Sequence, residues 1–339
     1  MGCSFNNQHS KFAIFNPLGS LLLYFWILFN VFALGMLILD LRVFHRPGHV
    51  VKFREALGWS LMYVAMAAVF AAILYSWQGR QTSLEFVAGY VVELSLSVDN
   101  LFVFLVIFNY FAVPDQLQHR VLFWGILGAL ILRGVFIGAG VELIQRFHWL
   151  LFVFGALLIY SGIRVFLSGG HQVNPSSNPI VKALRRLIPV TTDYRGGRFF
   201  VRNPQDNGRL YATPLLVVLL VIETTDVLFA VDSIPAVLAI TLKAFIVYTS
   251  NVFAILGLRS MYFALSGLIK VFRFLHYGLA VILILVGVKM ILGDYFEIPI
   301  GVTLGTVALV LLISIGLSVA YPAKDNGGNS RASEKSSEL

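Results

Sequence analysis

Most of this chain consists of apolar blocks that are separated by short polar stretches. About 20 consecutive apolar residues suffice for a transmembrane helix. The blocks predict nine spans, with boundaries good to a few residues, near 20–40, 57–77, 84–111, 121–144, 149–168, 213–241, 245–266, 274–292 and 299–320. The pattern therefore predicts an all-α fold, a polytopic transmembrane helical bundle.

Composition and charge agree with this class of protein. Of the 339 residues, 58% are hydrophobic and 12% are charged, which is about half the charged fraction of a soluble domain. Most of the 25 Lys and Arg residues fall in loops that are cytoplasmic if the amino terminus lies outside. The positive-inside rule thus predicts an outer amino terminus and a cytoplasmic carboxyl terminus. This distribution explains the net charge of +8 without a nucleic-acid partner, and the expected partner is the lipid bilayer.

One long polar segment, 169–212, interrupts the spans and is rich in Lys and Arg. We interpret it as a small cytoplasmic subdomain or an ordered linker, with a lipid-phosphate site as a weaker alternative. The tail from Lys324 is rich in Ser, Gly and charge, which predicts disorder. The predicted organisation is a two-span region at 1–82, a three-helix repeat at 83–168, the basic cytoplasmic linker at 169–212, a second three-helix repeat at 213–293, a last span at 294–321 and a cytoplasmic tail at 322–339.

Two groups of three spans resemble each other. SVDNLFVF, ILGALILRG and YSGIRVFL in the first group match TTDVLFAV, FAILGLRS and LVGVKMIL in the second. Aligning Asp99 with Asp226 places Arg133 opposite Arg259, at spacings of 34 and 33 residues. It also places Arg164 opposite Lys289, a further 31 and 30 residues along. A rival register pairs Asp99 with Asp232 and leaves only 27 residues to Arg259, so we favour the first. Three helices in each unit predict inverted repeats, an architecture in which secondary transporters hold their substrate near the membrane midplane.

Five carboxylates lie in the two acidic motifs of these repeats, ELSLSVDN and IETTDVLFAVDS, with hydroxyl and amide side chains beside them. An ionised aspartate at mid-bilayer costs about 2.5–3.5 kcal/mol even on the lenient insertion scale, so a cation is its natural partner. The structural alternative is a buried ion-pair network in which Arg133 and Arg259 neutralise two of the acids. Two arginines cannot balance five ionised acids, so we favour a cation site. The predicted metal ligands are Glu93, Asp99, Asn100, Glu223, Asp226 and Asp232, supported by Ser95, Ser97, Thr225, Ser233, Arg133 and Arg259.

The spacing of the acids predicts a ladder across the membrane. Six residues of helix rise about 9 Å, so Glu93 and Asp232 are each displaced outward from the aspartate at the centre of their span, and Glu223 lies one turn inward. Glu93 and Asp99 are about 240° apart on a regular helix, and a local break would bring them together. Pro235 supplies one cause of a break in the second motif, because proline removes a backbone hydrogen bond.

The donor atoms limit which ion such a site would take. Carboxylate, carboxamide and hydroxyl oxygens suit hard cations such as Mg²⁺, Ca²⁺ and Mn²⁺. Neither motif contains His or Cys, which argues against zinc or copper. The single cysteine, Cys3, excludes an intrachain disulfide and a cysteine metal cluster. We expect a transported divalent cation and no catalytic cofactor.

Three phrases, ELSLSVDNLFVFLVIFNYFAVP, IETTDVLFAVDSIPAVLAI and SNVFAILGLRSMYFAL, closely resemble the TerC family of integral membrane proteins, in particular its bacterial Alx-type members. The resemblance covers most of residues 20–320 and includes the loop phrase FFVRN…GRLYATPL. It implies a manganese exporter of the bacterial inner membrane, associated with tellurium resistance, in which the acidic motif residues bind the metal. Mn²⁺ is then the first choice of substrate and Ca²⁺ the second. The motif positions are held by Glu93, Asp99, Asn100, Glu223, Asp226, Asp232 and Ser233.

Three hypotheses follow from these observations. The leading one is a divalent-cation exporter that works by alternating access between the repeats. The second is an intramembrane aspartyl enzyme using Asp99 and Asp226, which we disfavour because the SVDN and TTDV contexts lack a Gly-x-Gly-Asp setting; we expect no enzyme. The third is a membrane component of tellurium, oxyanion or pH stress resistance that acts through partners, for which segment 169–212 is the place to look.

Overall fold

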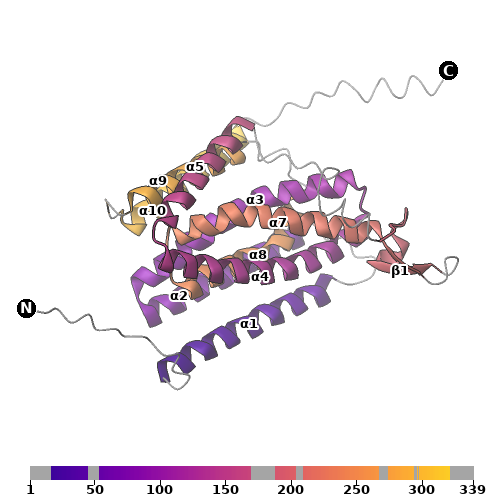
Figure 1. Cartoon of the computed structure of the whole chain (residues 1–339), viewed down its shortest axis with the longest axis horizontal. Helices are drawn as coiled ribbons and strands as arrows, with labels where there is room; N and C mark the ends of the chain where they lie inside the picture. The colour runs from indigo at the N-terminus through magenta and orange to yellow at the C-terminus, as the bar shows by residue number, and fades with distance from the viewer. Residues whose placement is uncertain are drawn as a thin grey trace, which may run out of the picture. The chain divides into compact units, whose positions relative to one another are not determined.

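The computed structural model describes most of the chain as long α-helices (Figure 1). Its described residues are 17–44, 53–168, 188–203, 209–266, 274–293, 296 and 298–320. Within these ranges the helices are α1 (Pro17–Phe44), α2 (Phe53–Gln78), α3 (Arg80–Tyr110), α4 (Asp115–Arg146), α5 (Leu150–Ser168), α7 (Pro214–Leu238), α8 (Ala244–Ser266), α9 (Leu275–Leu292) and α10 (Ile300–Ala320). A 3-10 turn, η2 (Arg195–Gly197), and two strands, β1 (Phe200–Asn203) and β2 (Arg209–Ala212), lie between α5 and α7.

Each predicted span coincides with one of these helices. Eight of the described helices are long and apolar enough to cross a membrane, and α1 contributes a shorter apolar helix at Tyr24–Leu39. Helices suit this environment because each backbone N–H and C=O is satisfied within its own segment. The chain divides into two units, Met1–Pro47 with α1 and Gly48–Leu339 with the remaining elements. The predicted class, a helical polytopic membrane protein, is confirmed.

Within the larger unit, α3 and α8 are the most enclosed helices. In α3 and α8, 72% and 78% of an apolar 18-residue stretch of the helix is buried inside the protein. The corresponding share is 17% in α10 and 22% in both α2 and α5. The acidic motif of the third span therefore lies in the protein interior, and α2, α5 and α10 present more of their surface to the surroundings. Polar groups on α3 and α8 must find their partners within the bundle, since the neighbouring helices exclude water.

Each helix of the first predicted repeat packs against a helix of the second. α3 packs against α8, α4 packs against α7, and α5 lies along α9. α3 and α7 run antiparallel: a Cβ built on Gly89 would lie 3.1 Å from Val237 Cγ1, while further along α3 Phe104 shares a cavity with Ile222. Helices α3 and α7 are the first members of the two predicted repeats, so an antiparallel pair is what inversion requires.

α5 lies along α9 (Figure 1), and the residues of this contact are reciprocal in the predicted register. A Cβ on Gly155 would lie 2.9 Å from the carbonyl oxygen of Gly287, and one on Gly162 would lie 2.7 Å from that of Ala280. Aligning Arg164 with Lys289 also equates Gly155 with Ala280 and Gly162 with Gly287. Exchanging the two repeats therefore turns one of these contacts into the other. The inverted repeat itself stays a prediction, which this packing supports.

The close backbone approach makes Gly287 a sensitive position. A Cβ there would lie 2.7 Å from the Gly155 carbonyl oxygen and 2.9 Å from Ile159 Cγ1. Small residues allow such contacts between membrane helices. We expect Gly287→Val to lower the free energy of unfolding by about 1–3 kcal/mol, the usual cost of overpacking. Thermal unfolding of the purified protein in detergent measures this, and Gly305→Val on α10, where nothing lies within 4 Å, is the matched control. Equal melting temperatures of Gly287→Val and Gly305→Val would contradict the close contact between α5 and α9 at Gly287.

The described part of the predicted linker is ordered and docked on the bundle. β1 and β2 form an antiparallel hairpin in which Phe200 pairs with Ala212. The Tyr194 hydroxyl donates to the carbonyl oxygen of Phe111 at 2.6 Å, and Arg120 Nη1 donates to that of Gly197 at 2.8 Å. Burial raises the pKa of the Tyr194 phenol above its ordinary value, so the hydroxyl remains a donor at neutral pH. The segment that leads into the hairpin is thereby fixed to the end of α3 and to the first turns of α4.

Two predictions about polar segments fall outside the described residues. These are the start of the linker, 169–187, together with 204–208 at the hairpin tip, and the predicted disordered tail from 322. The proposed division of the chain into repeats, linker and tail therefore stays a prediction.

Candidate cation site

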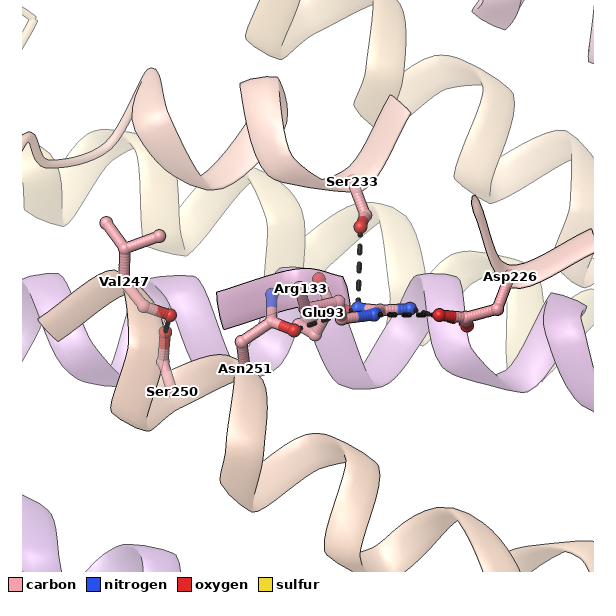
Figure 2. Close-up of polar contacts among 7 residues, drawn as sticks. All are labelled: Glu93, Arg133, Asp226, Ser233, Val247, Ser250 and Asn251. Carbon is pink, nitrogen blue, oxygen red and sulfur yellow. Dashed lines mark hydrogen bonds and ion pairs between the residues drawn. The ribbon is translucent and has the colours of Figure 1, made fainter. Parts of the chain in front are cut away.

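The side chain of Arg133 lies at the centre of a buried polar group (Figure 2). Only 1% of Arg133 is exposed. Its Nη2 and Nε face the two carboxylate oxygens of Asp226 at 3.0 and 3.3 Å, which is a two-point contact. Its Nη1 forms an ion pair with Glu93 and lies 2.9 Å from Asn251 Oδ1 and 3.5 Å from Ser233 Oγ. Side chains from α3, α4, α7 and α8 therefore meet at one guanidinium.

The charges in this group do not balance when all its members are ionised. One guanidinium faces two carboxylates, so one negative charge is in excess. Glu93 is fully buried, and its Oε2 has no hydrogen-bond partner among the described residues. Burying charged groups is costly unless each is paired and hydrogen-bonded. Arg133 thus neutralises one of the two acids, as the structural alternative requires. The remaining negative charge can still attract a further cation.

A second group of oxygen ligands lines a small cavity between α3, α7 and α9. Asp99 and Asn100 face it from α3, and Asp232 and Ser233 face it from α7. The cavity measures about 10 Å³, which is close to the least volume that holds one water molecule. Ser161 on α5 donates to Asp232 Oδ1 at 2.7 Å. Two carboxylates, a carboxamide and a hydroxyl are ligands that hard divalent cations prefer.

Glu223 occupies a third position, one helical turn from Asp226 on α7. Its carboxylate fills the space where a Cβ on Gly128 of α4 would lie, so a larger residue at position 128 would require the Glu223 side chain to move. Its Oε2 is buried and makes no hydrogen bond within the described part of the chain. A carboxylate oxygen in this state favours a nearby cation or a proton.

The six predicted ligands therefore form three neighbouring groups and not a single cluster. Among the described residues, no three His, Cys, Asp or Glu side chains gather closely enough to hold a metal ion. The groups are Glu93 with Asp226, then Asp99 and Asn100 with Asp232, and lastly Glu223. Ser233 joins the first two groups, because its side chain contacts Arg133 and also lines the cavity. The metal site stays a prediction.

The expectation of a local helix break is wrong. α3 is helical from Arg80 to Tyr110, and α7 is helical from Pro214 to Leu238 with Pro235 inside it. Pro235 lies in the last turn of α7, where the loss of one backbone hydrogen bond leaves the rest of the helix intact. Because α3 is unbroken, Glu93 and Asp99 point in different directions, one to Arg133 and the other to the cavity.

The supporting residues have mixed roles. Ser95 and Thr225 donate to carbonyl oxygens one turn earlier in their own helices, at 2.6 and 2.7 Å. Ser97 is fully buried, and its hydroxyl has no hydrogen-bond partner among the described residues. Arg259 is buried in α8, with 1% exposed. Ser233 and Arg133, also predicted in support, contact or line the acidic groups directly.

Sequence reasoning missed Asn251 and Ser161, which contact Arg133 and Asp232. Asn251 had a usable signal, since it is a polar residue in an otherwise apolar span, in the phrase SNVFAIL. Ser161 had none, because small hydroxyl residues are common in membrane helices.

A further polar contact joins α3 to the α7–α8 connection, far along α3 from the hairpin end. Lys243 Nζ lies 3.0 Å from Glu85 Oε2, and Thr241 Oγ1 donates to the same oxygen at 2.9 Å. Lys243 also donates to Thr82 Oγ1 at 2.9 Å. Half of the lysine side chain is exposed, so this ion pair adds little stability, but it ties together the ends of two motif helices.

Comparison with known proteins identifies the family. The model of the integral membrane protein TerC family matches residues 78–326, which include all the acids described above. An uncharacterized membrane protein of Myxococcus xanthus, STKORF319, is 50% identical over 87% of this chain and 91% of its own length. The protein of Salmonella typhi named "Putative membrane-bound redox modulator Alx" is 46% identical over 88% of this chain and 94% of its own.

The Escherichia coli K12 protein of the same name is 44% identical, again over 88% of this chain and 94% of its own length. No solved structure matches the chain. The helices, the acidic motifs and these matches agree, and the chain belongs to the TerC family of integral membrane proteins.

Proposed function

We propose that this protein transports a divalent cation across the bacterial inner membrane, with Mn²⁺ as its substrate. The observation that carries the proposal is the cavity where Asp99 and Asn100 face Asp232 and Ser233 inside a bundle of apolar helices. Acidic side chains at such depth are unfavourable without a positively charged partner. The two carboxylates of the cavity come from the first helices of the two predicted repeats, where secondary transporters bind their substrates.

The choice of Mn²⁺ rests on donor chemistry and on the resemblance to the TerC family. All the ligand atoms available are oxygens, which suit Mn²⁺, Ca²⁺ and Mg²⁺ over zinc or copper. The family resemblance favours manganese and an outward direction of transport. The lysine and arginine distribution favours an outer amino terminus and a cytoplasmic carboxyl terminus, so the docked hairpin would lie on the cytoplasmic side.

A second candidate function comes from the relatives that are named redox modulators. In this reading the protein acts through partners in redox, oxyanion or pH stress and moves no ion itself. The sequence contains one cysteine, Cys3, and a thiol–disulfide couple within one chain needs two. Redox modulation would therefore be indirect and would act through the redox-active groups of the partners.

Reconstituted vesicles that contain an ion-sensitive dye distinguish these functions. We expect the full-length protein to carry Mn²⁺ into the vesicles at a saturable rate, with Ca²⁺ slower and Mg²⁺ slowest, since a small octahedral ion gives up its water reluctantly. Tellurite, an anion, should not be carried by an acidic site. Absence of flux for all three cations, in protein that retains its helical content, would reject transport and leave the partner-mediated function.

A further inference from the structure

Glu93 and Asp226 are already paired with a positive charge of the protein itself, the guanidinium of Arg133. The guanidinium takes two contacts from Asp226 and one from Glu93 while being 1% exposed. Bidentate contacts between arginine and carboxylate are among the strongest hydrogen bonds in proteins. Arg133 occupies both oxygens of Asp226 and one oxygen of Glu93, so a metal ion that binds Asp226 must compete with the guanidinium.

Two neutral oxygens also face the guanidinium. Asn251 Oδ1 lies 2.9 Å from Nη1, and Ser233 Oγ lies 3.5 Å from the same atom. Figure 2 shows Asn251 and Asp226 approaching the guanidinium from opposite sides, with Ser233 over it. A guanidinium that lost its carboxylates would keep hydrogen-bond partners on α7 and α8, so it could stay buried near its present position.

Two small cavities border side chains that contact the guanidinium. Asp226 also lines a small apolar cavity with Phe104, Gly125 and Ile222. Ser233 lines the cavity that contains Asp99 and Asp232. An ion in the second cavity thus lies beside a side chain that contacts Arg133.

We infer that Arg133 is a tethered competitor of the transported ion: a divalent cation displaces its guanidinium from Glu93 and Asp226, and the guanidinium returns as the ion leaves. This inference rests on the proposed function and adds to it a residue that sets the affinity of the site. An ion pathway must bind its ion strongly enough for entry and weakly enough for release. The guanidinium favours release, because it neutralises the negative charge of the acids after the ion has left.

The predicted repeat indicates that this role belongs to Arg133 in particular. In the register that pairs Asp99 with Asp226, the residue that corresponds to Glu93 is Leu220. The second repeat therefore has no acid at the position from which Glu93 contacts Arg133. The pairing of one guanidinium with two carboxylates therefore depends on an acid that the predicted repeat does not duplicate.

The test is Mn²⁺ binding by the purified full-length protein in detergent, followed by the loss of the electron paramagnetic resonance signal of free Mn²⁺. We expect Arg133→Gln to reach half-saturation at a Mn²⁺ concentration at least tenfold below that of the wild type. Arg133→Lys should fall between them, because an ammonium group cannot bridge both carboxylates. Arg146→Gln, which alters an exposed pair with Glu142, should bind as the wild type does.

Wild-type or weaker affinity in both Arg133 variants would overturn the inference. If Arg133→Gln does not fold without metal, recovery of its folded yield by Mn²⁺ during purification supports the inference, and the lysine variant still decides it by affinity. Vesicle flux separates the two proposals. Flux with unchanged affinity in the variants rejects the competitor role alone, whereas tighter binding in the variants without wild-type flux rejects transport alone.

Discussion

Replacement of Asp99 by asparagine is expected to abolish Mn²⁺ efflux. Asp99 supplies one of the two carboxylates of the cavity between α3, α7 and α9, and asparagine keeps its shape while removing its charge. A divalent cation at this depth then faces one acid instead of two, and hydration in bulk water becomes the better alternative. The measurement is the manganese content of a manganese-sensitive bacterial host after exposure to Mn²⁺, with the variant and the wild type present at equal levels in the membrane.

The matched control is Glu142→Gln at the end of α4. Glu142 is exposed and pairs with Arg146 at 2.6 Å, so the same loss of charge should leave efflux unchanged. Asp226→Asn should behave like Asp99→Asn, because Asp226 belongs to the adjacent acidic group. Wild-type efflux from the Asp99 variant, with normal membrane levels, would show that the cavity does not carry the ion.

Replacement of Arg133 by glutamine is expected to cause the largest loss of stability. It leaves Glu93 and Asp226 buried without their cation, and breaking a buried ion pair in this way costs about 3–5 kcal/mol. Glu93→Gln should cost less than about 1 kcal/mol, since it leaves a neutral Arg133–Asp226 pair and an amide oxygen that still accepts a hydrogen bond. Unfolding in detergent without metal, followed by tryptophan fluorescence, gives both free energies.

The double variant Glu93→Gln with Arg133→Gln is the control for this prediction. It leaves only Asp226 uncompensated, so its loss of stability should be smaller than that of Arg133→Gln alone. Such non-additivity is expected between groups in direct contact. A cost below about 1 kcal/mol for Arg133→Gln would mean that the acids are neutral in the metal-free protein, and protonation would then replace Arg133 as the means of compensation.

The helices could be predicted from the sequence because bilayer thickness fixes their length. The predicted span at 57–77 lies within α2, and the predicted span at 274–292 differs from α9 by one residue at its start. The acidic motifs were found for the same reason, since any charge stands out in an apolar span. These features depend on composition along the chain alone.

The partners of the acids could be predicted only in part. The sequence paired Arg133 with Arg259 as equivalent positions, but it could not show that Arg133 contacts Asp226 of the other repeat and Glu93 at once. Those contacts depend on how each helix is rotated and which helices are neighbours, and apolar spans carry little periodicity from which to read this. Asn251 and Ser161 were missed because their roles arise from the same packing.

The break at Pro235 was predicted wrongly because the position of the residue within its helix was not known. The expected span continued to 241, whereas α7 ends at Leu238 and places Pro235 in its last turn. A proline there removes a single hydrogen bond, and the helix remains regular. The acids are consequently distributed along two unbroken helices in three groups, and the predicted ladder across the membrane remains the arrangement to be tested.

Net Mn²⁺ uptake into reconstituted vesicles is the measurement that tests the central claim most directly. The wild type and the double variant Asp99→Asn with Asp226→Asn are compared at equal protein content and equal helical content. If the acids of α3 and α7 carry the ion, uptake is saturable with the wild type and falls to the level of protein-free vesicles with the double variant. Equal uptake by the two proteins would contradict the claim.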